Sequence, residues 1–570
     1  MTTSSEVDLP PEAPSDSREV PPKPARSRLA ALRKWRFLQA AIAAAGIVLL
    51  AIAYYLQART IATISEGGSQ ALQAWDLLHG NVLLRGWSMS DVSFYTTEIP
   101  EYALVELVRG LNTWTIPLAA AISYFLQVVL GAFLAKGRAT GREGWVRALI
   151  AVGIMIAPPL GVPTALLMAS PDHVGTHVPL LLIFLVLDRV RPRWWLPIAV
   201  TVMLTLATIG DPLVIFEGAL PIAGVCLMRM YRRRASWSAQ WYDLSLAVGA
   251  VASAGGARLT LKLIQDAGGF YVRTPIAAFG TPSQVSALFW TKISNVLLVY
   301  GANFFGTVFG HSAYVALIHL VGVVLVFWAM AAVIRRFYVE DDLIAQVLTA
   351  AFMIVLVAYI LGTKPDSNEI VGLLPLGAVL AGRVLGSKVI KARLVPVLAV
   401  VFVTCAVFLG ADATAPSHLN PNQQVAMWLE QHHFTYGLAG YWNAAAVTVE
   451  TGDQVQVRPV RTYQASVVTA NFQTESTWYD PTKHYANFVI WTPGHLCGDI
   501  CLTRYGLTST FGTPTRVVDV GTFEVLIYNR NLLQSVPEVA WCGNAWAWKA
   551  TSPPTNDLHC AASGIAVNGP

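Results

Sequence analysis

Charged residues are scarce in this chain of 570 residues, of which 13% are charged and 54% hydrophobic. A soluble protein of ordinary composition carries about 25% charged residues. The deficit argues against a soluble globular protein and indicates a surface that faces membrane lipid. The formal net charge of +5 does not indicate a nucleic-acid partner, because the positive residues gather in short segments between apolar runs. We therefore expect membrane lipid, and no nucleic acid, among the partners.

Apolar runs of about 20 residues, the length that crosses a bilayer, recur along the first three quarters of the chain. We predict eleven spans near 37–56, 113–134, 148–168, 173–188, 194–210, 212–230, 244–264, 312–334, 343–362, 369–385 and 394–410. Successive loops should alternate between the two sides of the membrane. The short loops of one side then contain Lys364 as their only positively charged residue, whereas the loops of the other side are rich in Arg and Lys. The positive-inside rule then predicts a multi-pass inner-membrane protein with a cytoplasmic N-terminus and an extracytoplasmic C-terminus.

The same pattern predicts the domain organisation. Residues 1–36 form a disordered cytoplasmic tail with a basic end, and no cleavage site follows the first apolar run, which indicates an uncleaved anchor. The transmembrane domain covers 37–410, and an extracytoplasmic α+β domain covers 411–570.

Two long outer loops, 57–112 and 265–311, interrupt the spans. The stretch 287–305 is predicted as an interfacial or re-entrant helix, because another span there would break the charge pattern. In the C-terminal domain we expect a helix at 421–432 and a hairpin formed by 515–520 and 522–528. The fold class is therefore an α-helical polytopic membrane protein with an α+β outer domain.

Cysteine is also rare, with six residues in the chain. Cys226 and Cys405 fall within spans and are expected to be inert, whereas the other four fall in the C-terminal domain: Cys497, Cys501, Cys542 and Cys560. In an oxidising compartment these four favour disulfides, with Cys497–Cys501 and Cys542–Cys560 as the nearest pairing. A four-cysteine zinc site is the alternative, although the spacings differ from the usual zinc knuckles.

The spans contain few ionisable residues, and the sequence shows no internal repeat. Both absences argue against an ion-coupled carrier. The acidic residues gather instead in the outer loops and at the outer ends of spans: Glu66, Asp76, Asp91, Glu98, Glu101, Asp172, Asp211 and Asp366. Such a distribution suits chemistry at the outer membrane surface.

The first outer loop carries the most specific signal. It contains Ser65-Glu66 at the start of a predicted helix, Leu77-Leu78-His79-Gly80 at its end, and Thr96-Thr97-Glu98-Ile99-Pro100-Glu101 before a further short helix. In order and spacing, this loop resembles the GT-C superfamily of glycosyltransferases that use lipid-linked sugars. That superfamily includes protein O-mannosyltransferases and aminoarabinose transferases. The resemblance covers the arrangement of the whole chain, and the match of individual residues covers about 65–110.

The composition, rich in Ala, Val and Trp, suggests an actinobacterial source.

Two positions depart from the family pattern. Ser65 stands where the family has its catalytic Asp, which leaves Glu66 as the nearest carboxylate. Ile99 stands where some members have a lysine that meets the lipid phosphate. Either Glu66, Asp91 or Glu98 takes a different role in this chain, or the activity has been lost.

The resemblance implies transfer of a sugar from a polyprenyl-phosphate donor to a glycan or lipid acceptor, with inversion at the sugar carbon. The acceptor hydroxyl then needs a general base within hydrogen-bonding reach. Glu66 and Asp91 are the candidates, and Glu98 would orient the acceptor or help to hold a divalent cation. The departing phosphate needs a cation, for which the candidates are Arg85, Arg109, Arg258 and Lys262. Each of these side chains has an ordinary alternative as a solvated or headgroup-anchoring residue.

Three further residues at the outer ends of spans are expected to support the site or bind the acceptor: Asp172, His173 and Asp211. Asp172 and Asp211 are equally explained as a helix cap and a turn former. His173 and His177 are four residues apart and share a helical face, but no third metal ligand stands near them in the sequence.

The leading hypothesis is thus a GT-C-like transferase. The alternative is a non-catalytic membrane scaffold, or a lipid- or glycan-binding envelope protein, that lost its carboxylate at Ser65. A lipid or glycan exporter is a third hypothesis. A ligase of the O-antigen type is expected to place its main outer loop late in the chain and not after the first span.

Overall fold

The computed structural model describes residue 41 and residues 44–233, 237–273, 278–415, 420–463, 465–470, 472–494, 501–536, 539–542 and 545–548. The chain divides into two compact units, Met1–Leu50 and Ala51–Pro570. The six-stranded sheet, the candidate site and all helices from Ser65 onwards belong to the second unit.

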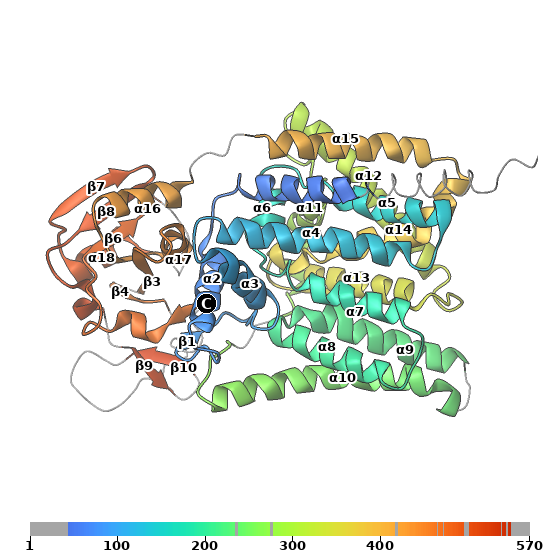
Figure 1. Cartoon of the computed structure of the whole chain (residues 1–570), viewed down its shortest axis with the longest axis horizontal. Helices are drawn as coiled ribbons and strands as arrows, with labels where there is room; N and C mark the ends of the chain where they lie inside the picture. Colours follow the sequence, from blue (N-terminus) through green and yellow to red (C-terminus); the bar gives the residue numbers. More distant parts are fainter. Residues whose placement is uncertain are drawn as a thin grey trace, which may run out of the picture. The chain divides into compact units, whose positions relative to one another are not determined.

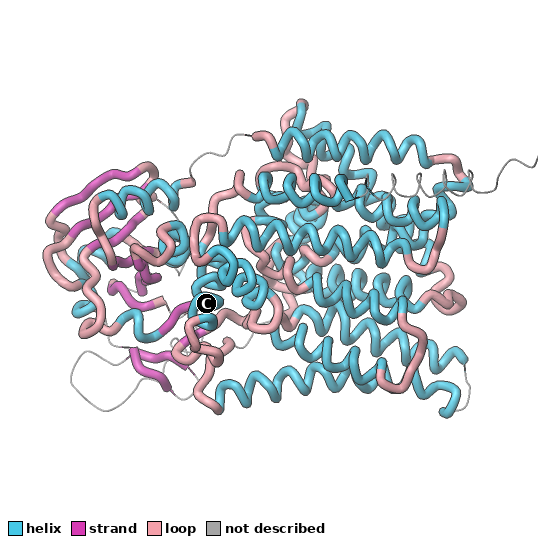
Figure 2. The backbone as a smooth tube through the Cα atoms, in the orientation of Figure 1, coloured by secondary structure: helices cyan, strands magenta, loops and turns pink. Residues whose placement is uncertain are grey.

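Long apolar helices form the first part of this unit (Figures 1 and 2). After an apolar helix at Ala44–Ala58, the bundle contains α4 (Thr115–Lys136), α5 (Gly141–Met155), α6 (Val162–Met168), α7 (His177–Arg189), α8 (Leu196–Gly210), α9 (Leu220–Arg233), α10 (Trp237–Asp266), α11 (Pro282–Val299), α12 (His311–Ile334), α13 (Leu343–Leu361), α14 (Leu373–Lys391) and α15 (Val395–Ala413). Among the described residues, six helices are long and apolar enough to cross a membrane: α4, α10, α12, α13, α14 with the turn before it, and α15. The chain is a polytopic helical membrane protein, as predicted.

Several predicted span boundaries were wrong. The span predicted at 148–168 begins at Gly141, is interrupted after Met155, and resumes as α6 at Val162. Pro158 and Pro159 lie in the interruption, and proline cannot donate the backbone hydrogen bond that a helix interior needs. The Gln57 side chain donates to the freed Pro158 carbonyl at 2.7 Å. The span predicted at 212–230 begins with a π-helical turn, η1 (Ile215–Ala219), before α9.

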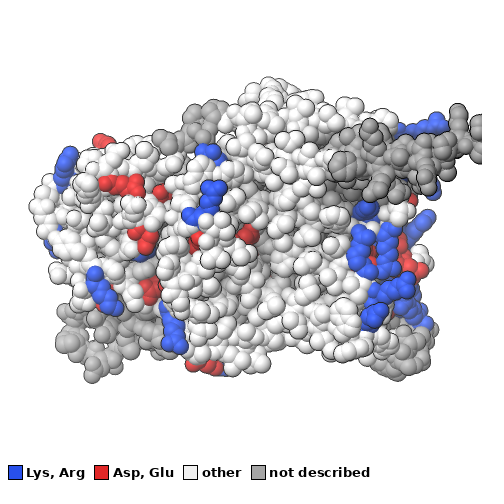
Figure 3. Space-filling view, in the orientation of Figure 1, with Lys and Arg blue, Asp and Glu red and all other residues white. Residues whose placement is uncertain are grey.

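Positive side chains gather at one end of the bundle (Figure 3). This end carries the exposed residues Arg142, Arg191, Arg193, Arg335 and Arg336. Two short ion pairs hold α14 there, since Arg383 contacts Asp188 and Asp342 at 2.5 Å each. The face seen in Figure 3 has a broad band without charged side chains next to this end. The positive-inside rule predicts that this end of the bundle lies on the cytoplasmic side.

At the other end of the bundle, the first long loop folds into two helices, α2 (Ser65–Leu78) and α3 (Glu98–Arg109), and the short strand β1 (Trp87–Ser88). The first of these helices was predicted to end at Gly80. In the structure it ends at Leu78, and Gly80 follows with a φ of +101°, a value that glycine adopts readily. The second helix begins at Glu98 and not after Pro100, because proline is tolerated in the first helical turn.

The C-terminal region combines helices and strands, in agreement with the predicted α+β class. It contains α16 (Pro421–Gln431), β2 (Tyr436–Ala439), α17 (Tyr441–Glu450), β3 (Gln456–Tyr463), β4 (Ser466–Thr469), β5 (Thr474–Glu475), the turn η3 (Ser476–Tyr479), β6 (Phe488–Trp491), α18 (Arg504–Phe511), β7 (Arg516–Val520), β8 (Phe523–Ile527), the turn η5 (Leu532–Ser535), β9 (Val539–Cys542) and β10 (Ala545–Trp548). The helix and the β7–β8 hairpin lie where they were predicted.

Six of these strands form one sheet in the order β4-β3-β2-β6-β8-β7. The central strand β2 runs parallel to both β3 and β6. The chain crosses from β2 through α17 to β3, then returns to the opposite side of β2 as β6. The carboxyl ends of these parallel strands meet at one edge of the sheet.

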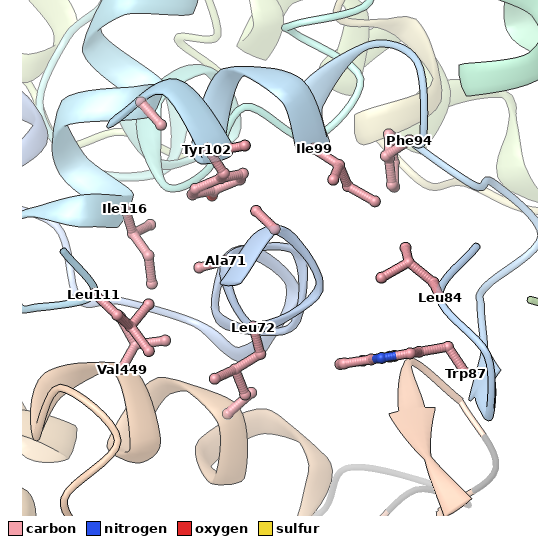
Figure 4. Close-up of a cluster of buried hydrophobic side chains, with 14 of the residues drawn as sticks. Ala71, Leu72, Leu84, Trp87, Phe94, Ile99, Tyr102, Leu111, Ile116 and Val449 are labelled. Atoms are coloured by element: carbon pink, nitrogen blue, oxygen red, sulfur yellow. The ribbon is translucent and has the colours of Figure 1, made fainter. Parts of the chain in front are cut away.

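Helix α2 joins the C-terminal region to the bundle. Its buried side chains pack between α3 and α17, with Ala71 on the side of Tyr102 and Leu72 on the side of Val449 (Figure 4). Gly68 permits this contact, because a Cβ at Gly68 would lie 2.8 Å from the backbone of Ala445 and Ala446. In addition, β1 pairs with β5. The first loop and the C-terminal region therefore share one apolar core.

The cysteine predictions are tested only in part. Cys226 and Cys405 are buried and free, as expected for residues in spans. Cys497, Cys560 and the side chain of Cys542 lie outside the described residues. The two proposed disulfides stay a prediction.

Candidate active site

Glu66 lies in the first turn of α2 and is half-buried at the end of the bundle next to the C-terminal region. Its electrostatic neighbours are Asp91, from a later part of the same first loop, Asp172 and His173, from the loop between α6 and α7, and Asp366, from the loop after α13. Burial, and next the negative charge of Asp172, raise the pKa of Glu66 to about 8. The fold thus brings together carboxylates that lie up to 300 residues apart in the sequence.

Ser65, at the position of the family's aspartate, does not face this acidic cluster. Its hydroxyl accepts a hydrogen bond from the backbone N–H of Ala446 in α17 at 3.3 Å, and the residue is fully buried. An aspartate at position 65 would contact α17 in this structure. Glu66, and not Ser65, is the residue of this pair that reaches the cluster.

Asp172 and His173 lie on the loop between α6 and α7. Gln70 of α2 donates to Asp172 at 3.3 Å, which joins this loop to the helix that carries Glu66. His173 has a φ of +54°, an unusual value for a residue with a side chain. Its Nδ1–H donates to Asp211 at 2.7 Å, and its ring meets the edge of Phe94. The loop is therefore held in one conformation by three separate elements.

The His173–Asp211 pair is charged. Burial acts to lower the pKa of His173, but Asp211 and Asp172 hold it well above its usual value. Burial acts to raise the pKa of Asp211, yet the charge of His173 keeps the pKa of that carboxyl below its usual value. His173 is thus a cation at neutral pH in the midst of carboxylates.

Glu98 is fully buried at the start of α3. It accepts hydrogen bonds from Thr97 and from Thr176, the latter at 2.8 Å, and burial raises its pKa to about 8. A Cβ at Gly175 would lie 2.7 Å from the Glu98 side chain, so the loop packs directly on the carboxyl group. This placement favours a role for Glu98 in holding the loop between α6 and α7.

The predicted phosphate-binding cations do not converge on this cluster. Arg85, Arg109, Arg258 and Lys262 are all exposed. Arg109 lies near Tyr55, and Lys262 pairs with Asp266 one turn along α10 at 3.3 Å. Their role as phosphate ligands stays a prediction, and so does the alternative that they contact lipid headgroups.

Arg273 is a cation that the sequence analysis missed. The segment around it is attached to the first loop, since the Arg273 N–H donates to the Ser90 carbonyl at 3.0 Å and the Met89 N–H donates to the Tyr271 carbonyl at 2.8 Å. Asp91 is among its electrostatic neighbours. One signal was present in the sequence, because Arg273 and Lys292 are the only cations in the predicted outer loop 265–311.

A second His–carboxylate pair lies next to the first. His177 and Glu217 are 2.8 Å apart and almost completely buried, and both lie against the backbone of Gly372. In the sequence, His177 is a candidate metal ligand without a third ligand near it. Within the described ranges, no group of three or more His, Cys, Asp or Glu side chains is arranged to hold a metal ion.

No protein-family model and no curated protein matches this sequence. The structure, however, superposes on that of ArnT from Cupriavidus metallidurans bound to undecaprenyl phosphate, with a TM-score of 0.50 and 11% identity over 85% of this chain and 97% of ArnT. ArnT, an aminoarabinose transferase, is a GT-C protein. The chain has the GT-C fold.

Two further structures are less similar. ArnT without ligand gives a TM-score of 0.40 at 12% identity, over 89% of this chain and 99% of ArnT. The Archaeoglobus fulgidus oligosaccharyltransferase gives 0.41 at 11% identity, over 78% of this chain and 69% of the enzyme. At these identities the GT-C likeness concerns the fold and not the chemistry.

Proposed function

We propose that this protein transfers a sugar from a polyprenyl-phosphate donor to a glycan or lipid acceptor at the outer face of the cell membrane. The observation that carries the proposal is the convergence of Asp91 and Asp172 on Glu66, which lies in the first turn of α2, the helix between the bundle and the C-terminal region (Figure 1). The GT-C fold supports a glycosyltransferase, and the ArnT structure holds undecaprenyl phosphate.

Glu66 is the general base in this proposal. Its carboxylate takes the proton of the acceptor hydroxyl while the acceptor oxygen forms a bond to the anomeric carbon of the sugar. The bond from that carbon to the phosphate oxygen breaks on the opposite side, and its electron pair leaves with the polyprenyl phosphate. A single displacement of this kind inverts the configuration. A base is most effective when its pKa lies near the working pH, which suits a pKa of about 8.

The other members of the cluster have supporting roles. Asp91 and Asp172 raise the basicity of Glu66 through their negative charge. His173, held by Asp211, offers the Nε2–H of a cationic ring to an oxygen of the substrate.

The non-catalytic alternative rested on Ser65. In this proposal Glu66, which reaches the cluster, takes the role of the missing carboxylate, and Ser65 contacts α17 instead.

Transfer of a labelled sugar from a polyprenyl-phosphate donor, measured in membranes, tests the proposal. We expect Glu66→Gln to lower the rate by about 10²–10⁴-fold, the usual contribution of a general base. Asp91→Asn is expected to have a smaller effect. Glu143→Gln, at the positive end of the bundle, is the matched control and should leave the rate unchanged. Full activity of the Glu66→Gln protein would refute the assignment.

A further inference from the structure

Helix α2 has three faces with different surroundings. One face packs on α17 through Gly68, and another packs on α3 through Ala71 (Figure 4). The third face carries Glu66, which reaches the acidic cluster. Residues three and four positions apart are neighbours on the surface of a helix. Ser69 and Gln70 therefore lie beside Glu66 on this third face.

Ser69 and Gln70 each have a buried oxygen atom that is available for a hydrogen bond. Ser69 is 1% exposed and Gln70 is 0% exposed. Within the described part of the chain, neither the Ser69 Oγ nor the Gln70 Oε1 has a hydrogen-bond partner. The amide of Gln70 is held in place by Asp172, to which its Nε2–H donates at 3.3 Å. A buried polar group without a partner is costly, which indicates that a further group completes these hydrogen bonds.

Tyr441, the first residue of α17, supplies a third such oxygen. It is 1% exposed, and its hydroxyl has no hydrogen-bond partner among the described residues. Glu66 is the first of its electrostatic neighbours, and Asp172 is the next. Its ring meets the rings of Trp442 and Phe472, with centroids 5.2 Å and 5.0 Å away. These contacts hold the ring in place, so the hydroxyl stays near Glu66.

The three groups are uncharged, which sets them apart from the cluster beside them. Serine and tyrosine hydroxyls both donate and accept hydrogen bonds, and an amide oxygen accepts. Several hydroxyl groups on neighbouring carbon atoms, as in a carbohydrate, would pair with all three groups at once. The single hydroxyl of a lipid alcohol would leave two of them without a partner. Glu66 and Asp172 are partly exposed, so a ligand can reach this place from the solvent.

We propose that Ser69, Gln70 and Tyr441 form a subsite for a carbohydrate acceptor, and that they bind hydroxyl groups next to the one that Glu66 deprotonates. The inference rests on the proposed transfer reaction and narrows its acceptor to a glycan. Buried groups that pair with substrate hydroxyls also confer specificity, because an analogue without such a hydroxyl leaves them unpaired.

Binding to the purified full-length protein in nanodiscs, measured by saturation-transfer NMR, tests the subsite. The probes are the methyl pyranosides of glucose, galactose and mannose, methyl arabinofuranoside, and dihexanoylglycerol as a lipid alcohol. The variants Ser69→Ala and Tyr441→Phe each remove one oxygen atom. Tyr528→Phe is the matched control, because the Tyr528 hydroxyl is also buried without a partner in the described chain, but its electrostatic neighbours are Arg504 and Arg530.

We expect the wild type to bind at least one of the glycosides, and Ser69→Ala and Tyr441→Phe to bind it about fivefold more weakly. Tyr528→Phe should bind it as the wild type does. Deoxy derivatives of the bound glycoside sharpen the test. The derivative that lacks the hydroxyl held by Tyr441 should bind equally to the wild type and to Tyr441→Phe, because the two changes remove the same hydrogen bond. A merely structural effect would weaken the binding of both ligands alike.

Two results would overturn the subsite: a wild type that binds none of the glycosides, and glycoside binding that is unchanged in both Ser69→Ala and Tyr441→Phe. Binding of dihexanoylglycerol that weakens in both variants would overturn the carbohydrate assignment in favour of a lipid alcohol. The transfer assay separates the two proposals. Loss of transfer in Glu66→Gln with unchanged glycoside binding in the two variants refutes the subsite alone. Full transfer in Glu66→Gln with weakened glycoside binding refutes the base alone.

Discussion

At the scale of single residues, the chemistry depends on the charge state of Glu66. The base must be unprotonated to accept a proton, and its pKa is raised to about 8. We therefore expect kcat/KM for transfer to rise with pH up to about 8 and to level off above it, because the unprotonated form is lost as the pH falls. A pH profile of the wild type and of Glu66→Asp, which keeps a carboxylate, measures this. A flat profile between pH 6 and pH 9 in the wild type would contradict the role of Glu66.

The sequence predicted some residues of the site and not others. Glu66, Asp172, His173 and Asp211 could be identified because each stands at the end of a predicted helix or span on the outer side. Arg273 could not, because its place depends on a backbone hydrogen bond to Ser90, more than 150 positions away in the sequence. Local patterns carry no information on such contacts.

At the scale of elements, the close packing of α2 on α17 depends on Gly68. A Cβ at this position meets backbone atoms, which cannot move aside as a flexible side chain can. We expect Gly68→Ala to destabilise the protein by about 1–3 kcal/mol and to lower the transfer rate, since α2 carries Glu66. Chemical denaturation and the transfer assay measure the two effects.

Gly410→Ala is the control for this prediction, because a Cβ there has no atom within 4 Å. It should not destabilise the protein. Equal stability of the two alanine variants would show that the α2–α17 contact has room for a side chain.

The two ion pairs of Arg383 hold the other end of the bundle. Removal of this guanidinium group leaves Asp188 and Asp342 without their shared partner, and both contacts are 2.5 Å. We expect Arg383→Gln to cost on the order of 3 kcal/mol of stability, measured by thermal unfolding. Arg147→Gln, which breaks the single-turn pair with Glu143, should cost less than about 0.5 kcal/mol. A similar loss in both variants would contradict a special role for Arg383.

At the scale of the whole molecule, the charge distribution predicts the orientation in the membrane. We expect the C-terminal region outside and the Lys- and Arg-rich loops inside. Labelling of intact cells with a membrane-impermeant maleimide tests this. Tyr485→Cys, at a residue 55% exposed in the C-terminal region, should react at once, and Arg191→Cys should react only after the membrane is permeabilised. The opposite result would reverse the topology and move the proposed reaction to the cytoplasmic face.

The sequence by itself determined the helical membrane fold, the approximate spans and the α+β character of the C-terminal region. These features follow from apolar length, charge bias and alternation, which are local properties of the chain. Only the tertiary structure decided that Ser65 contacts α17 while Glu66 joins Asp91 and Asp172. It also decided that Arg273 is attached to the first loop through Ser90. The physical reason is that burial and charge proximity set the chemistry of these groups, and both arise only when segments far apart in the sequence pack together.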